Sequence, residues 1–214
     1  MAQTKNHKPD FAYPEVVSTE AQKELNTALK KGDGRGVVNS LINYAVAQTL
    51  IDKDNQPETI KRIEQIVATE KDPCTSALLN IILIDLYTDI YSNDFNKYNQ
   101  RDNQLLPLPD DIFTWDSNQF KHKILSLCNE ALTNTDALKL SKISEYSSLL
   151  NLDNLSKIYY PTLYDFVAHR CIEVVEHIYN PGKFEQSWLC DFEKFQNLDF
   201  SSVAPADQFI LNTY

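Results

Sequence analysis

The sequence predicts an all-α protein in which antiparallel helical hairpins stack in a repeat-like, tetratricopeptide-like right-handed array, followed by an irregular C-terminal tail. Apolar residues recur at helical spacing along most of the chain. Only four of the 214 residues are glycine, whereas eleven are tyrosine and ten are phenylalanine. This composition suits bulky contacts between helices better than tight β-hairpin turns. Capping residues and prolines also stand where the helices would begin.

Four helices are predicted in the first half of the chain. The first starts near Ser18, the second is capped by Asp33, the third carries Pro57 in its first turn, and the fourth is capped by Asp72. The fourth segment is apolar around most of its circumference, so we expect it at the centre of the fold. The four would form two hairpins with a repeat of roughly forty residues.

The second half opens with a polar, proline-bearing loop at residues 96–113. A fifth helix at residues 114–134 would be capped by Thr114 or Asp116, residues 135–159 are irregular, and Pro161 leads into a last long helix. The side chains that we expect to be buried in the resulting core are Leu79, Ile82, Leu86, Leu127, Phe166 and Val174.

The predicted domain organisation has three parts. Residues 1–17 form a flexible N-terminal extension, residues 18–180 the helical domain, and residues 181–214 an aromatic-rich tail that docks on it or leads to a following domain. Pro181 and Gly182 stop the last helix. We expect Trp188 to dock on the chain's own helices and residues 209–214 to be loosely held, because so much aromatic surface is not left in water on a monomer.

Charge and hydropathy exclude several classes of partner. The formal net charge is −10 and the basic residues are scattered, so nucleic acid is not an expected partner. The most apolar run, "SALLNIILIDLY", is broken by Asn80 and Asp85, so no membrane span is predicted. No pair of the four cysteines has CxxC spacing, which excludes a local zinc ribbon or thioredoxin-type motif, and we expect buried thiols in preference to a disulfide framework.

The last predicted helix carries the densest chemistry of the chain. On a helical wheel the apolar arc includes Phe166 and Cys171, which points this thiol toward the core and makes it a poor nucleophile. His169, Glu173 and His177 follow one edge of the polar side at i, i+4 and i+8, a stripe that can chelate a divalent metal. A dedicated zinc site needs three or four ligands, and a solvated face with ion pairs explains the stripe more simply.

Two other motifs indicate structure rather than chemistry. The glycine-rich "GDGRG" lacks the preceding strand and the following lysine and serine of a phosphate loop, and a turn between helices explains its glycines. The paired Asp110 and Asp111 precede a helix, where carboxylates serve as caps. With no GxSxG or HExxH motif in the chain, the sequence predicts no catalytic residue and no cofactor.

Two segments resemble a known family. "DDIFTWDSNQFKHKIL", with its aspartate-x-x-x-tryptophan opening, and "YYPTLYDFVAHRCIEVV" are similar to the N-terminal helical region of large bacterial alpha-2-macroglobulin-like proteins. That resemblance implies export to the cell envelope and membership of a protease-trapping protein. None of the four cysteines is followed by glycine, so the thioester sequence of the family is missing, and so is its string of β-sandwich strands. Inhibition is therefore not carried over to this chain.

Three functions are consistent with the sequence. The favoured one is a non-catalytic helical scaffold that contacts a protein partner or following domains. The alternatives are a small metal-assisted hydrolase using His169, Glu173 and His177, and a stand-alone tetratricopeptide-like adaptor. The N-terminus has no apolar signal region, which fits a cytoplasmic protein as well as a trimmed envelope protein. The aromatic residues proposed for docking are Trp115, Tyr160, Tyr164, Trp188, Phe200 and Phe209.

Overall fold

The computed structural model describes residues 11–101, 107–147, 149–150, 152 and 156–179. All regular elements within these ranges are helical, and the one pairing of extended residues is an isolated antiparallel bridge between Lys142 and Thr162. The all-α prediction is therefore confirmed for the described part of the chain.

Nine α-helices and three short 3-10 helices follow one another along these residues. The α-helices are α1 (Pro14–Lys31), α2 (Gly34–Ile51), α3 (Gln56–Val67), α4 (Pro73–Asn93), α5 (Phe95–Asn99), α6 (Ser117–Leu132), α7 (Thr135–Leu140), α8 (Ser156–Tyr159) and α9 (Leu163–Tyr179). The 3-10 helices are η1 (Lys53–Asn55), η2 (Ile112–Thr114) and η3 (Ile143–Glu145).

Side-chain caps start three of the long helices as the sequence predicts. The carboxylate of Asp33 accepts the backbone N–H of Gly36 at 3.0 Å, and that of Asp72 accepts the N–H of Thr75 at 2.8 Å. For α6 the cap is Asp116 and not Thr114, because Asp116 exchanges hydrogen bonds with Gln119 in a complete capping box. Local sequence alone is enough to place these helix starts.

Two boundaries differ from the prediction. Helix α1 begins at Pro14, inside the segment expected to be an extension, because proline at the first helical position already has the helical φ angle. Ser18 is therefore no cap; it is buried, and its hydroxyl accepts a hydrogen bond from Gln48 Nε2 at 2.7 Å. Within the expected loop at residues 96–113, α5 forms because Tyr98 is fully buried.

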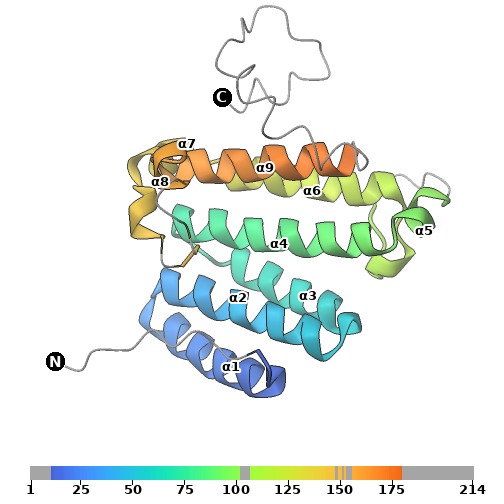
Figure 1. Ribbon diagram of the computed structural model, residues 1–214, viewed down its shortest axis with the longest axis horizontal. Helices are drawn as coiled ribbons and strands as arrows, with labels where there is room; N and C mark the ends of the chain where they lie inside the picture. Colours follow the sequence, from blue (N-terminus) through green and yellow to red (C-terminus); the bar gives the residue numbers. More distant parts are fainter. Residues whose placement is uncertain (1–10, 102–106, 148, 151, 153–155, 180–214) are drawn as a thin grey trace, which may run out of the picture.

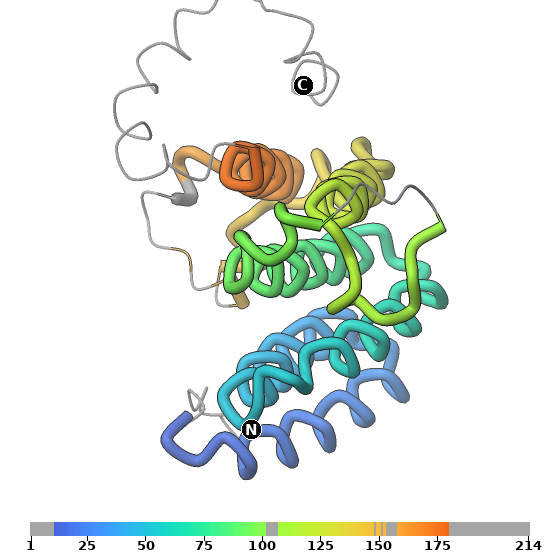
Figure 2. Tube along the Cα trace, turned by 90° about the vertical axis from the view of Figure 1, so that its right-hand side faces the viewer, coloured from blue at the N-terminus to red at the C-terminus, as the bar shows by residue number. Residues whose placement is uncertain are grey.

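Helix α4 lies at the centre of the fold, where it contacts α2, α3, α6, α7 and α9. Figure 1 shows α2, α4 and α9 stacked in that order and running in the same direction, whereas α1, α3 and α6 run the opposite way. Viewed from the end, α9 and α6 lie next to each other on one side of α4, with α1 and α2 on the other side (Figure 2).

Five of the six predicted core residues are buried: Leu79, Ile82, Leu86, Leu127 and Val174. Phe166 is only partly buried, and its ring meets the edge of Tyr160 instead. The buried arc of α9 includes Tyr164 and Ala168 rather than Phe166, and Lys139 of α7 lies over the ring of Tyr164 on that side. The helical wheel therefore predicted the buried side of α9 incorrectly at Phe166. The buried side depends on neighbouring helices that the sequence of α9 does not specify.

Candidate functional site

The charged groups of α9 face α4 across a half-buried network centred on Arg170. Its Nε and Nη2 donate to Oδ1 of Asp85 at 3.1 and 2.7 Å, and its Nη1 donates to Glu173 at 2.9 Å. One guanidinium therefore neutralises a carboxylate on each helix. The arrangement fixes α9 against the central helix, as a forked cation between two acids does.

Burial shifts the acids of α4 toward their protonated forms. It raises the pKa of Asp85, and the nearby charge and hydrogen bonds of Arg170 offset only part of that shift. The pKa of Asp89, one turn further along α4, is also raised by burial, against the attraction of Arg170 and Lys53. For Arg170 itself burial lowers the pKa, but the carboxylates of Asp85 and Glu173 outweigh it and raise the pKa overall.

The two histidines of the predicted stripe have different neighbours. The ring of His169 lies 4.9 Å from the ring of Tyr160, and burial lowers the pKa of His169 despite the acids at Glu173 and Asp165. His177 lies further along, with its Nε2 2.9 Å from the hydroxyl of Ser92 on α4. Each histidine therefore contacts a different neighbour.

The structure does not assemble the metal-binding stripe that the spacing permits. Glu173 is held by Arg170, and His177 is turned toward Ser92. Among the described residues no group of three or more histidine, cysteine, aspartate or glutamate side chains is placed to hold a metal ion. Residues four apart on one helix can share an ion, but a site needs further ligands from elsewhere in the fold.

Cys171 is the only thiol of α9, and it lies in the core as expected. It is 1% exposed and hydrogen-bonded to Cys128 of α6, and this bond together with burial strongly raises the pKa of Cys171. A thiol in this state is not a nucleophile. Cys74 and Cys128 are also buried free thiols, which confirms the expectation for these three, while Cys190 lies outside the described residues.

Trp115, predicted to dock a partner, is instead part of the core. It is 5% exposed, its ring stacks on Tyr87 of α4 at 5.6 Å and 9°, and its edge meets Phe120 of α6. Its indole N–H donates to the carbonyl of Pro109 at 2.8 Å, which holds the loop before α6. This residue is therefore unavailable to a partner, because the fold itself covers the ring.

The other docking candidates divide between packed and undescribed residues. Tyr164 is buried, with the ammonium of Lys139 4.8 Å above its ring. Tyr160 is half-buried between Phe166 and His169. Trp188, Phe200 and Phe209 lie outside the described residues, as does the expected tail of residues 181–214.

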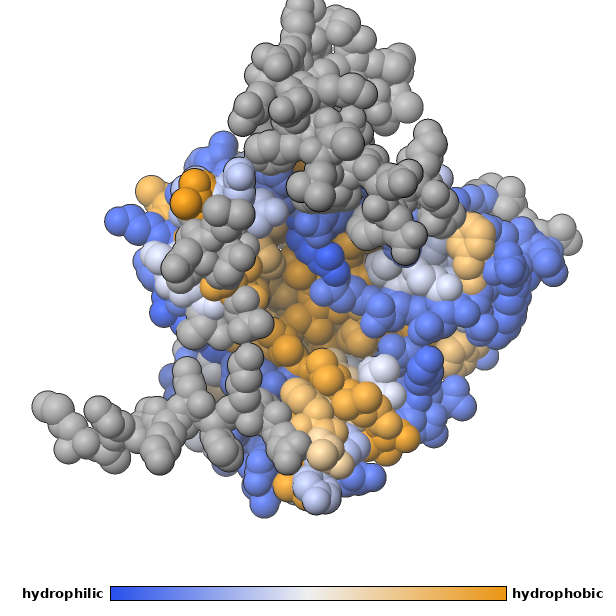
Figure 3. All heavy atoms as spheres, in the orientation of Figure 1, coloured by the Kyte–Doolittle hydropathy of each residue, from blue (hydrophilic) through white to orange (hydrophobic). Residues whose placement is uncertain are grey.

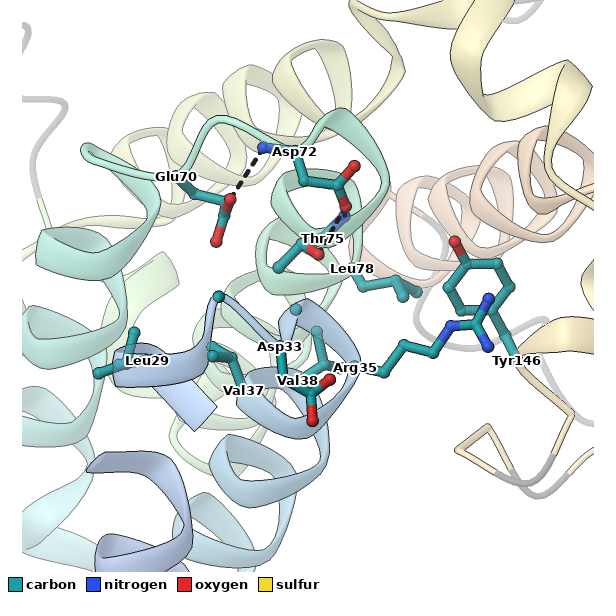
Figure 4. Close-up of a pocket in the computed structure, with 12 residues that line it drawn as sticks. Leu29, Asp33, Arg35, Val37, Val38, Glu70, Asp72, Thr75, Leu78 and Tyr146 are labelled. Carbon is teal, nitrogen blue, oxygen red and sulfur yellow. Dashed lines mark hydrogen bonds between the residues drawn. The ribbon is translucent and has the colours of Figure 1, made fainter. Parts of the chain in front are cut away.

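The "GDGRG" segment lines a hollow of about 450 Å³ between the starts of α2 and α4 (Figure 4). Gly32 ends α1 with a left-handed φ of 64°, which is the turn that the sequence predicts. Glycine at position 34 has a different explanation, because a Cβ added there would lie 2.0 Å from Oγ1 of Thr75. Arg35 reaches from the same segment to Glu145, at 2.6 Å, and lies over the ring of Tyr146.

The carboxylates around this hollow already bind backbone groups. Besides the caps of α2 and α4, Oε1 of Glu70 accepts the N–H groups of Lys71 and Asp72, at 2.7 and 2.8 Å. Acceptors thus occupy the helix N-termini that a phosphate would need, and negative charge surrounds them. Arg35 also lines the hollow, but it is paired with Glu145, so the hollow does not favour an anion.

A second hollow, of about 280 Å³, lies where α3, α4 and the loop before α6 meet. Here Glu64 accepts a hydrogen bond from the hydroxyl of Tyr87 at 2.9 Å and pairs with Lys123 at 2.8 Å. Burial and the charge of Glu64 together raise the pKa of Tyr87. Sequence reasoning missed this cluster, because its three members come from three helices and no local spacing connects them.

Comparisons of the chain with models of protein families, with curated proteins and with solved structures each found no match. One described helix, α4, is long and apolar enough to cross a membrane by length and composition. Of its most apolar window, 72% is buried inside the fold, as in the core helix of a globular domain.

Proposed function

We propose that this chain is a non-catalytic helical scaffold that contacts a protein partner or neighbouring domains of the same polypeptide. The observation that carries the proposal is that the polar side chains of residues 159–179 make contacts within the fold. Thr162 and Asp165 start α9 with reciprocal hydrogen bonds, and Arg170 ties α9 to α4. The conspicuous polar residues of this segment thus bind other parts of the fold.

The same segment carries the resemblance to alpha-2-macroglobulin-like proteins. We therefore place the chain at the N-terminal helical part of such a protein, in the cell envelope after export. This placement rests on the two similar segments. In one of them, "YYPTLYDFVAHR", the residues form a capped helix start followed by contacts between helices.

We further propose that three successive helix pairs, α1–α2, α3–α4 and α6–α9, form a right-handed, tetratricopeptide-like array. Each pair is in contact, and α2, α4 and α9 share one direction (Figure 1). Stacking of equivalent pairs would give α2, α4 and α9 a common face, which is the surface that such arrays offer to partners.

Two measurements test these proposals. Metal analysis of the purified chain distinguishes the scaffold from the alternative hydrolase, because stoichiometric zinc or manganese would overturn the non-catalytic assignment. The complete open reading frame of the gene tests the family placement. A frame that continues for many hundreds of residues into strand-rich sequence supports it, and one that stops at Tyr214 refutes it.

A further inference from the structure

An apolar stripe runs along α2, partly buried against the core at Ile42 and exposed toward the end of the helix. Ile42, Val46 and Leu50 are spaced by four residues and therefore share one side of the helix. Val46 is 41% exposed, Leu50 56% and the neighbouring Ile51 38%. Figure 3 shows an apolar, hollowed band on the face that carries α2, α4 and α9.

Exposed apolar side chains concentrate at this end of the molecule. Because α1 and α2 are antiparallel, the start of α1 lies beside the end of α2 and adds Tyr13 (65% exposed) and Val16 (54%). Five of the ten large apolar side chains that are exposed among the described residues are therefore found here. The other five are scattered over α1, α7, α8 and α9.

We infer that the stripe is the docking site of this chain's own segment 184–200. Phe184, Trp188, Phe192 and Phe195 are spaced by four, four and three residues, which brings side chains onto one face of a helix. Val46 and Leu50 are exposed apolar side chains, and an aromatic face of this kind would cover them. Docking one on the other removes both from water.

The chain connection permits this docking. Helices α2 and α9 run in the same direction, so the end of α9 at Tyr179 lies at the same end of the molecule as Leu50 (Figure 1). One helix, α4, lies between them, and two interhelical spacings amount to about 16–20 Å. The eight residues 180–187 span up to about 26 Å when extended, so Trp188 reaches the stripe.

Charge favours α2 over its neighbour α4 as the docking site of residues 184–200. Residues 184–200 contain four acidic side chains and one basic side chain, a net charge of −3. On α4 the exposed Asp89 would repel an acidic segment, whereas Asp85 is paired with Arg170. Helix α2 has no acidic residue between Gly34 and Ile51. The inference holds whether or not the chain serves as an interaction module for other proteins.

Limited chymotrypsin digestion of the full chain, with cleavage sites located by mass spectrometry, is the test. Val46→Ser/Leu50→Ser should speed cleavage within residues 184–200 by about tenfold, the effect of losing about 1.4 kcal/mol of docking free energy. Leu140→Ser, which removes an apolar side chain that is 85% exposed on α7, is the matched control and should leave the rate within about twofold. Equal rates in both variants would overturn the inference.

The reciprocal experiment measures amide hydrogen exchange in residues 42–51. Trp188→Ser/Phe192→Ser should speed exchange there and leave residues 78–86 of α4 unchanged. Sedimentation of the full chain over a range of concentrations identifies a different occupant. If protection of α2 rises with concentration as the mass doubles, a second copy covers the stripe and the intramolecular docking is wrong.

Discussion

Arg170 on α9 contacts Asp85 on α4 through two nitrogens, with Nε and Nη2 at 3.1 and 2.7 Å from the same carboxylate oxygen. Asp85 is the acid that interrupts the apolar run of the central helix, and Arg170 belongs to the segment that resembles a known family. The contact gives both residues the same role, which is to join α9 to α4. It places a charge on α4 that Arg170 of α9 neutralises, and so favours this packing of the two helices.

Replacing Arg170 with methionine should lower the free energy of unfolding by about 1–2 kcal/mol, because Asp85 is left with no cation at hydrogen-bonding distance while remaining half-buried. Urea denaturation followed by circular dichroism measures the loss. Adding Asp85→Asn to this variant should recover part of it, since the unpaired charge is then gone. If the double variant is as unstable as the sum of the single variants, the two side chains are not coupled.

Acid should destabilise the fold through His169. Burial lowers the pKa of His169 below its usual 6.5, so the unfolded chain binds this proton more readily than the folded one does. The contribution of His169 is present above pH 6.5 and is lost as the pH falls through the folded-state pKa. His169→Gln should flatten the fall in unfolding free energy below pH 6.5, and His122→Gln, at an exposed histidine of α6, should not.

The carboxylate of Asp89 makes the unfolding free energy depend on pH in the opposite direction. Its pKa is raised by burial, so the folded state holds the proton more tightly, and stability falls as the pH rises above the usual 3.8. Asp89→Asn should therefore be more stable than the parent at pH 7, by less than about 1 kcal/mol because solvent still reaches this partly shielded side chain and screens its charge. The two proteins should converge near pH 3, and a difference that is equal at both pH values would contradict the electrostatic origin.

Features that depend on a few neighbouring residues could be predicted from the sequence. The caps at Asp33 and Asp72 each need only an acceptor and a nearby N–H, and both are present in the structure. Features that depend on remote contacts could not. Phe166 is only partly buried, because the buried side of α9 depends on how α4, α6 and α7 pack against it. Glu64 meets Tyr87 and Lys123 only once three helices are assembled.

The indole of Trp115 illustrates the same limit and gives another prediction. A tryptophan before a helix suits a docking surface, but here Tyr87 and Phe120 cover the ring and its N–H binds Pro109. Trp115→Phe keeps most of the packing and removes the hydrogen bond, so the free energy of unfolding should fall by about 1–3 kcal/mol. Thermal or urea unfolding measures it. Tyr13→Phe, at a side chain 65% exposed, is a control that should change little.

The starts of α2 and α4 approach each other closely at Gly34 and Thr75. A Cβ at Gly34 would lie 2.0 Å from Oγ1 and 3.2 Å from Cβ of Thr75, and that hydroxyl is held at 2.6 Å by Asp72. Gly34→Ala should therefore cost about 1–3 kcal/mol of stability through overpacking, although alanine is the better helix former.

A double-mutant cycle with Thr75→Ala tests the cause. Removing the Thr75 side chain opens the space, so the alanine at position 34 should be tolerated in the double variant, with a favourable coupling energy of about 1–2 kcal/mol. Gly32→Ala is the matched control. Its cost comes from the left-handed φ of 64°, because a Cβ added at Gly32 would meet no neighbouring atom within 4 Å. Thr75→Ala should therefore not relieve that cost. If the loss from Gly34→Ala persists unchanged in the Thr75→Ala background, its cause is not the contact between the starts of α2 and α4.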